Sequence, residues 1–223
     1  MYIHIYKMLI SHKKKFITID IPKTGTRSLR ETLNPLGVID IIGEPIREAD
    51  FYQHGTAKEA KESFIKYSLD WSEYFKFTIL RNPWDRYFSF FKYFRNYKDK
   101  YLNKCSSIIW NEPEVNQGKY CVELFENYTN HEIMNSIITN HQPQSDFIFD
   151  ENGVLMVDYI ASFENLDEEF KFLCAKTKTK YLPLKHGNKS KTFFDKKHFY
   201  SEELVKMVRE KEKSVIEIKG YNF

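Results

Sequence analysis

The chain has few cysteines, and they do not form the patterns typical of disulfide scaffolds or zinc sites. Its 223 residues include three, Cys105, Cys121 and Cys174. They lie far apart, no two form a Cys-x-x-Cys pair, and their number is odd. This usage argues against a disulfide-stapled secreted fold and indicates reduced thiols in a cytoplasmic protein. It also predicts no metal site.

Long apolar runs are missing as well. Residues 1–10, MYIHIYKMLI, are apolar, but the run is short and is interrupted by His4 and Lys7. No small-residue cleavage site follows it. We therefore expect neither a membrane anchor nor an export signal.

Positively and negatively charged residues are nearly balanced in number. Lysine and arginine number 34 against 31 aspartates and glutamates, which leaves a net charge of +3. A surface for general nucleic-acid binding is not expected at this balance, so any basic function must come from local clusters.

What the chain does have is apolar and aromatic bulk. Hydrophobic residues make up 42% and aromatic residues 17% of the sequence, which excludes a disordered chain. The length is sufficient for one well-buried α/β domain and short for two. We predict a single domain over residues 1–223.

Two strand-turn-helix units predict a central parallel sheet flanked by helices. The first runs from an apolar strand at 15–21 into a helix after Gly25, and the second from a strand at 75–80 into a long helix from Pro83. In such a sheet the carboxyl ends of the strands form one ligand crevice. The other expected elements are a strand at 2–10, a helix opened by a capping box at Thr56, a helix at 117–139, strands at 147–149 and 154–163, and helices at 166–175 and 200–217.

An aromatic stripe runs along the helix that starts at Pro83. Its members recur at helical spacing: Trp84, Tyr87, Phe88, Phe91 and Phe94. Such a stripe is more typical of a core than of a ligand platform, so we expect it to be buried.

The first turn has the composition of a phosphate site. Gly25 allows the backbone to approach an anion, the following helix presents free amides, and Lys23 adds a mobile cation. Thr24, Thr26 and Ser28 add hydroxyl donors. The turn is not a Walker A loop, because its lysine precedes the glycine. A strand, a turn and a helix also occur without any ligand, so this alternative stays open.

The second turn places Arg81 at the carboxyl end of its strand and Ser89 about two helical turns further along. A guanidinium and a hydroxyl so placed suit a second phosphate. The alternative is that Arg81 pairs with Asp85 and that Ser89 is a small residue on a packed helix face.

Together the two turns carry a family resemblance. PKTGTRSL after one strand and RNPWDRYFSFF after the other resemble the two phosphate-binding motifs of sulfotransferases that use 3′-phosphoadenosine 5′-phosphosulfate (PAPS). The closer likeness is to the carbohydrate branch, which includes the heparan 2-O and chondroitin enzymes, and to compact soluble bacterial or viral types. Residues 54–59, 157–166, 186–190 and 220–223 are similar to later segments of that family. The sequence departs from the family pattern at Thr26, Arg27 and Phe91.

The resemblance implies a P-loop NTPase-like sulfotransferase fold and in-line transfer of a sulfuryl group from PAPS to a hydroxyl of a sugar or glycan. His54 would act as general base, and Lys23 would stabilise the leaving group. Arg81 and Ser89 would hold the 3′-phosphate. The 5′-phosphate would be held by Pro22, Lys23, Thr24, Gly25, Thr26, Arg27 and Ser28, and the nucleotide would also be contacted by His186, Asn188 and Ser190. Without the family pattern, His54 reads equally well as a structural loop residue.

The acceptor side is less defined. Gln142 and Gln144 are candidate acceptor contacts, no metal is expected, and the product would be 3′-phosphoadenosine 5′-phosphate (PAP). Two other classes remain open: a catalytically silent protein that binds adenosine bisphosphate or sulfated glycan, and a P-loop kinase. The kinase lacks its GxxxxGK[ST] motif here.

Overall fold

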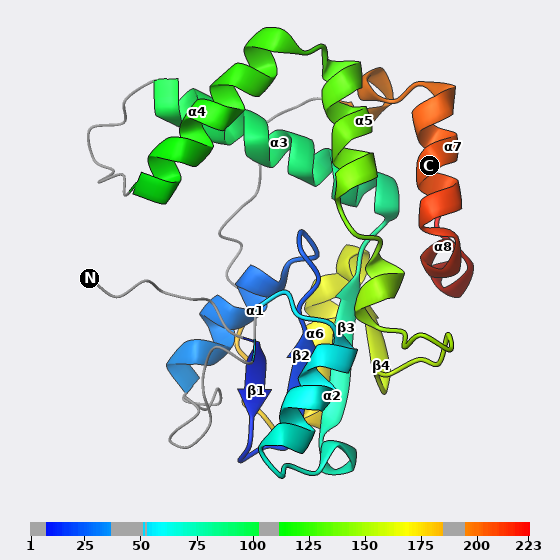
Figure 1. Cartoon of the computed structure of the whole chain (residues 1–223). Coiled ribbons are helices and arrows are strands. Elements are labelled where there is room, and N and C mark those ends of the chain that lie inside the picture. Colours follow the sequence, from blue (N-terminus) through cyan, green and yellow to red (C-terminus); the bar gives the residue numbers. More distant parts are fainter. Residues whose placement is uncertain (1–7, 37–50, 52, 103–111, 185–194) are drawn as a thin grey trace. The chain divides into compact units, whose positions relative to one another are not determined.

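The computed structural model describes residues 8–36, 51, 53–102, 112–184 and 195–223, which form two compact units (Figure 1). The first unit comprises Met1–Arg81 with Pro143–Lys189, and the second Asn82–Gln142 with Ser190–Phe223. Each unit thus combines two distant stretches of chain. The expectation of a single domain over 1–223 stays a prediction.

The first unit is built on a four-stranded sheet. Its strands are β1 (Leu9–Ser11), β2 (Phe16–Ile19), β3 (Phe75–Leu80) and β4 (Tyr159–Ser162), hydrogen-bonded in that order. The β1–β2 pair is an antiparallel hairpin, whereas β2–β3 and β3–β4 are parallel. The prediction of an α/β chain is confirmed, and the sheet, expected to be parallel, is mostly parallel because β1 pairs with β2 in the antiparallel direction. Because β2, β3 and β4 run the same way, their carboxyl ends lie along one edge.

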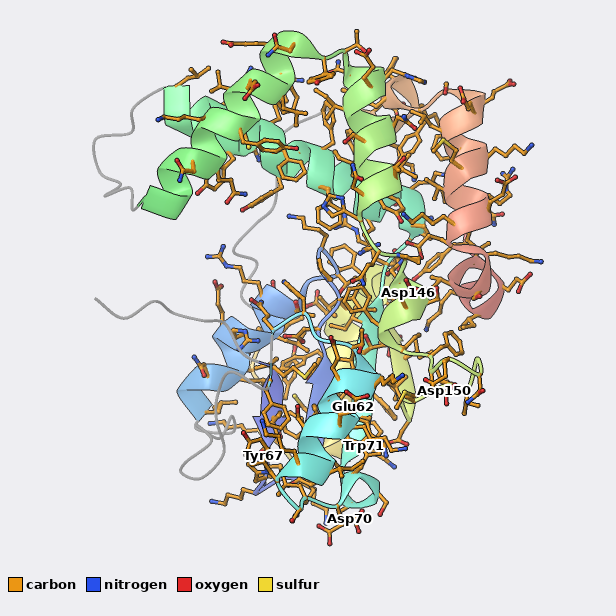
Figure 2. The ribbon with its side chains drawn as sticks, in the orientation of Figure 1. Glu62, Tyr67, Asp70, Trp71, Asp146 and Asp150 are labelled. Atoms are coloured by element: carbon orange, nitrogen blue, oxygen red, sulfur yellow. The ribbon has the colours of Figure 1, made fainter. Side chains whose placement is uncertain are left out.

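In its described residues this unit has three α-helices: α1 (Thr26–Leu33), α2 (Ala57–Lys66) and α6 (Leu166–Lys176). Apolar residues of α1 and α6 join one core cluster with Phe77 and Ile79 of β3, so both helices pack on the same face of the sheet. The predicted capping box opens α2, with Thr56 accepting from the backbone of Glu59. Tyr67 is the C-cap of α2, and Trp71 opens the 3₁₀ helix η3 (Trp71–Glu73) that follows it (Figure 2).

The second unit is helical in the part that the structure describes. It contains α3 (Pro83–Leu102), α4 (Glu112–Asn127), α5 (Asn130–Asn140), α7 (Glu202–Lys211) and α8 (Lys213–Lys219). Four members of the predicted aromatic stripe are buried in its core: Trp84, Tyr87, Phe88 and Phe91. Phe94 is partly buried against the same core. The prediction that the stripe is core is confirmed.

Two predicted helices are each broken into two, and both breaks have a physical cause. The helix expected at 117–139 divides at Thr129, which caps α5 in a reciprocal capping box with Glu132. The helix expected at 200–217 divides at Glu212, whose fully buried carboxylate accepts from Arg86 and Tyr87. The first break has a sequence signature, Thr-x-x-Glu, but the second depends on partners more than 120 residues away.

The predicted strands around residue 150 are shorter than expected. Residues 144–147 form the 3₁₀ helix η4 (Gln144–Phe147), and a single bridge joins Phe149 to Leu155. The Asp150 carboxylate accepts from the amides of Asn152 and Val154, which closes a tight turn in place of an extended strand. Regular pairing starts only at Tyr159. None of the helices in the described ranges combines the length and apolarity needed to cross a membrane.

Candidate functional site

The turn between β2 and α1 has a special backbone conformation. Gly25 is the N-cap of α1 with φ of +89°, and Lys23 also has a positive φ, +70°. For a residue with a Cβ this left-handed conformation costs about 1–2 kcal/mol. Lys23 therefore needs support from surrounding groups, which the structure supplies through Arg81.

Within the described residues, the N-terminus of α1 has neither a side-chain cap nor an acidic residue in its first turn, and its Ser28 amide donates to the Gly25 carbonyl at 3.0 Å. By contrast, the N-termini of α2, α5 and α7 are capped by Thr56, Thr129 and Ser201, and all three have acidic residues in the first turn. The first amides of a helix lack intrahelical acceptors and carry the positive end of its dipole. This end of α1 therefore suits an anion.

Gly25 is required by its surroundings as well as by its φ angle. A Cβ at this position would lie 2.9 Å from Cε2 of Phe163 and 3.0 Å from Cδ2 of Leu166. Phe163 follows β4 directly and opens the 3₁₀ helix η5 (Phe163–Asn165). The residue that follows β4, the third of the parallel strands, thus packs closely against the turn.

The side chains of the turn, residues 22–28, differ in burial and in whether they already have a hydrogen-bond partner. The buried Thr24 hydroxyl donates to the Ile21 carbonyl at 2.9 Å, so its proton is already used inside the turn. Thr26 is buried, and the exposed Arg27 donates to Glu31 at 2.7 Å. Pro22, Lys23 and Ser28 are half-buried.

Arg81 contacts the turn from the end of β3. Its Nη1 donates to the Lys23 carbonyl oxygen at 3.0 Å, and its guanidinium carbon lies 4.2 Å from the centre of the Phe163 ring. Asp85, the alternative partner considered for Arg81, forms an ion pair with Lys196 at 3.0 Å. The strand order places the turn, Arg81 and Phe163 at neighbouring carboxyl ends.

Gln144 fixes the main chain of Arg81. Its Oε1 accepts from the Arg81 amide at 3.0 Å, and its Nε2 donates to the Arg81 carbonyl at 2.9 Å. The side chain is fully buried. Gln144 was a candidate contact for the acceptor. Its side-chain oxygen and nitrogen are both hydrogen-bonded to the main chain of Arg81.

His54 lies at the same edge of the sheet. Its Nδ1 is 2.8 Å from the main-chain oxygen of Asp20, the residue that follows β2. A carbonyl oxygen only accepts, so Nδ1 carries the proton and the lone pair of the neutral ring is on Nε2. The side chain is exposed, and this tautomer suits a general base.

A buried ion pair that sequence reasoning missed lies next to the turn. The Asp20 carboxylate is fully buried, and its Oδ2 accepts from Arg30 of α1 at 2.9 Å. Burial raises the pKa of Asp20 to about 7, although Arg30 opposes the shift. The signal in the sequence was an aspartate within the otherwise apolar run Ile19–Ile21.

The structure thus brings together, within the first unit, Lys23, Gly25, His54, Arg81 and Gln144. Ser89 and Gln142 belong to the second unit. Ser89 is half-buried on α3, and the main-chain oxygen of the exposed Gln142 accepts from Arg86. His186, Asn188 and Ser190 lie outside the described residues.

Among the described residues, no group of three or more His, Cys, Asp or Glu side chains is arranged to hold a metal ion. The site contains backbone amides, a lysine, an arginine and an imidazole. These groups suit the transfer of a charged group between oxygen atoms.

A comparison with known protein families gives a match over most of the chain. The model of a family described as the sulfotransferase family matches residues 6–218. No curated protein and no solved structure matches the chain. The family match covers nearly the whole chain and agrees with its mostly parallel α/β sheet, and it supports sulfuryl transfer in general. This chain belongs to the sulfotransferase family.

Proposed function

We propose that the chain transfers a sulfuryl group from PAPS to a hydroxyl of a sugar or glycan. The observation that carries this proposal is the uncapped, acid-free N-terminus of α1 behind a turn that contains Lys23 and Gly25 and is held by Arg81. The amides and dipole of α1 favour an anion there, and the turn itself supplies one cation, Lys23, and is contacted by a second, Arg81. Family membership supports the same kind of chemistry.

The proposed reaction is an in-line displacement at sulfur. The acceptor oxygen forms a bond to sulfur while the bond from sulfur to the bridging oxygen of the donor breaks, and PAP leaves. Negative charge grows on that bridging oxygen, where Lys23 would stabilise it. The amides at the start of α1 would hold the 5′-phosphate throughout.

The proton of the acceptor hydroxyl needs a base. His54 would take it on Nε2, because Nδ1 donates to the Asp20 carbonyl oxygen and fixes the ring tautomer. The 3′-phosphate distinguishes PAPS from ATP. We assign its recognition to Arg81 and, on the motif resemblance alone, to Ser89.

The first test is calorimetric titration of PAP into wild type, Arg81→Ala and His54→Ala, with ATP and 5′-AMP as control ligands. Lys171→Ala is a matched control, since this exposed lysine pairs with Glu168 on its own helix, α6. We expect selective PAP binding that is lost with Arg81, survives loss of His54 and is unchanged in the control. Binding that ignores the 3′-phosphate would contradict the donor assignment.

Transfer is tested separately, with radiolabelled PAPS and a panel of glycan acceptors. Wild type should label at least one acceptor, and Lys23→Ala and His54→Ala should abolish labelling. PAP binding without any transfer would instead favour the silent binding protein. Magnesium-dependent ATP hydrolysis would favour the kinase.

A further inference from the structure

The Gln144 side chain forms two hydrogen bonds with one residue of the site, Arg81. Its amide oxygen and nitrogen bind the main-chain N–H and C=O of Arg81, at 3.0 and 2.9 Å. Such a paired contact fixes both the position and the orientation of the Arg81 backbone. The contact comes from η4, which is marked by Asp146 in Figure 2 and lies more than 60 residues along the chain from Arg81.

The Arg81 side chain is fixed in turn. Its guanidinium lies over the Phe163 ring at 4.2 Å and donates to the Lys23 carbonyl oxygen. A flat guanidinium over an aromatic face is favourable, and the ring limits the directions in which its donors point. The residue that it holds, Lys23, has the unfavourable left-handed backbone conformation.

Phe163 also touches the turn from a second side. Its ring carbons Cε2 and Cδ2 lie 2.9 and 3.0 Å from the position of a Cβ on Gly25. One ring therefore supports the guanidinium that binds Lys23 and fills the space beside Gly25. Neither Phe163 nor Gln144 needs to touch a ligand to affect the turn.

We propose that Gln144 and Phe163 are positioning residues that hold the Lys23–Gly25 turn in its anion-binding conformation through Arg81. The proposal rests on the proposed function, because the anion in question is the 5′-phosphosulfate of the donor. It gives Arg81 a second task on the 5′ side of the nucleotide, beside recognition of the 3′-phosphate. It also assigns Gln144 to the donor site and not to the acceptor site.

One consequence separates this role from a contact with the acceptor. If Gln144 bound acceptor, its loss would raise the KM for acceptor and leave the ligand-free turn unchanged. If it positions the turn, its loss should loosen residues 21–28 before any ligand is added. Amide exchange of this segment is therefore the deciding readout.

The experiment measures hydrogen–deuterium exchange of the ligand-free protein, followed by calorimetry with PAP. The variants are Gln144→Leu and Phe163→Leu, which remove the amide grip and the ring. Phe163→Tyr keeps the ring, and Ser145→Ala is a control next to Gln144. We expect exchange in residues 21–28 to rise about tenfold in the two leucine variants. Both should weaken the charge-assisted hydrogen bond from Arg81 to Lys23, and the loss of one such bond corresponds to about this factor. Exchange in α7, in the other unit, should not change.

PAP affinity should fall about tenfold in the same two variants and stay near wild type in Phe163→Tyr and Ser145→Ala. Unchanged exchange in residues 21–28 in either leucine variant would overturn the proposal, and so would a rise in Phe163→Tyr equal to that in Phe163→Leu. The Phe163 pair decides the matter by itself if Gln144→Leu does not fold. If exchange rises as expected but wild type binds no PAP, the positioning role stands and the donor assignment fails.

Discussion

Gly25→Ala is the substitution for which the structure makes the sharpest prediction. The added methyl group meets two constraints at once, a φ of +89° and the side chains of Phe163 and Leu166 at 2.9 and 3.0 Å. Either the turn must change its backbone conformation or the ring must move. Both responses displace groups that contact Lys23 or Arg81.

The expected cost follows from the two constraints. A left-handed conformation costs a residue with a Cβ about 1–2 kcal/mol, and overpacking of this kind about 1–3 kcal/mol. Together they amount to roughly 2–5 kcal/mol, a large part of the 5–15 kcal/mol that stabilises a typical folded protein. Movement of Phe163 also removes support from Arg81, so we expect PAP binding to weaken beyond what stability alone explains.

Gly153→Ala is a matched control in the same unit. Gly153 has a φ of +75°, but no atom lies within 4 Å of the position of its Cβ. Its substitution should therefore cost only the conformational part, about 1–2 kcal/mol. The difference between the two variants measures the contact with Phe163 and Leu166.

The assay is thermal and urea unfolding of both variants, together with calorimetric titration of PAP. In a chain of this size each kcal/mol lowers the midpoint by about 2–4 °C. We expect Gly25→Ala to unfold well below Gly153→Ala and to lose PAP binding, whereas Gly153→Ala retains it. Equal midpoints and equal PAP affinities in the two variants would refute the close packing argued for this turn.

Three further predictions concern stability. Glu212→Gln should lower the free energy of unfolding by about 3–5 kcal/mol, because it removes the negative charge that compensates the buried Arg86 cation; a urea midpoint equal to wild type would contradict this. Thr56→Ala should cost about 1 kcal/mol through loss of the cap of α2, measured in the same way, with Thr56→Ser as the variant that restores it. Asp20→Asn should flatten the pH dependence of stability. The folded-state pKa of Asp20 is raised to about 7 from 3.8, so between these values the folded protein holds a proton that the unfolded chain has released. Its unfolding free energy therefore falls as pH rises, by up to about 1.4 kcal/mol per pH unit, and equal slopes for wild type and variant would contradict the assignment.

Local patterns predicted much of the fold. The apolar run at 15–21 and the turn after it are contiguous, and so are the capping box at Thr56 and the aromatic stripe from Trp84. Each depends on residues within a few positions of one another, which is the range over which propensity, capping and periodicity act. These elements formed where the sequence predicted them.

The break at Glu212 shows where such patterns fail. Residues 200–217 have the periodicity of one amphipathic helix, yet α7 ends at Lys211 because the Glu212 carboxylate is buried against Arg86 and Tyr87. Nothing within a helical turn of Glu212 indicates this. The competing force is a tertiary ion pair, and it overrides local propensity.

The residues that support the site depend on strand register, which the sequence pattern left undetermined. Phe163 reaches Arg81 because Leu80 pairs with Ser162, so that both strands end level with each other. A slip of one residue between β3 and β4 would turn the side chains of β4 to the other face and take Phe163 away from the guanidinium. Motifs are readable because their residues face a ligand together from one short segment. Phe163 and Gln144 both lie more than 60 residues beyond Arg81 in the chain, and only the tertiary fold makes them its neighbours.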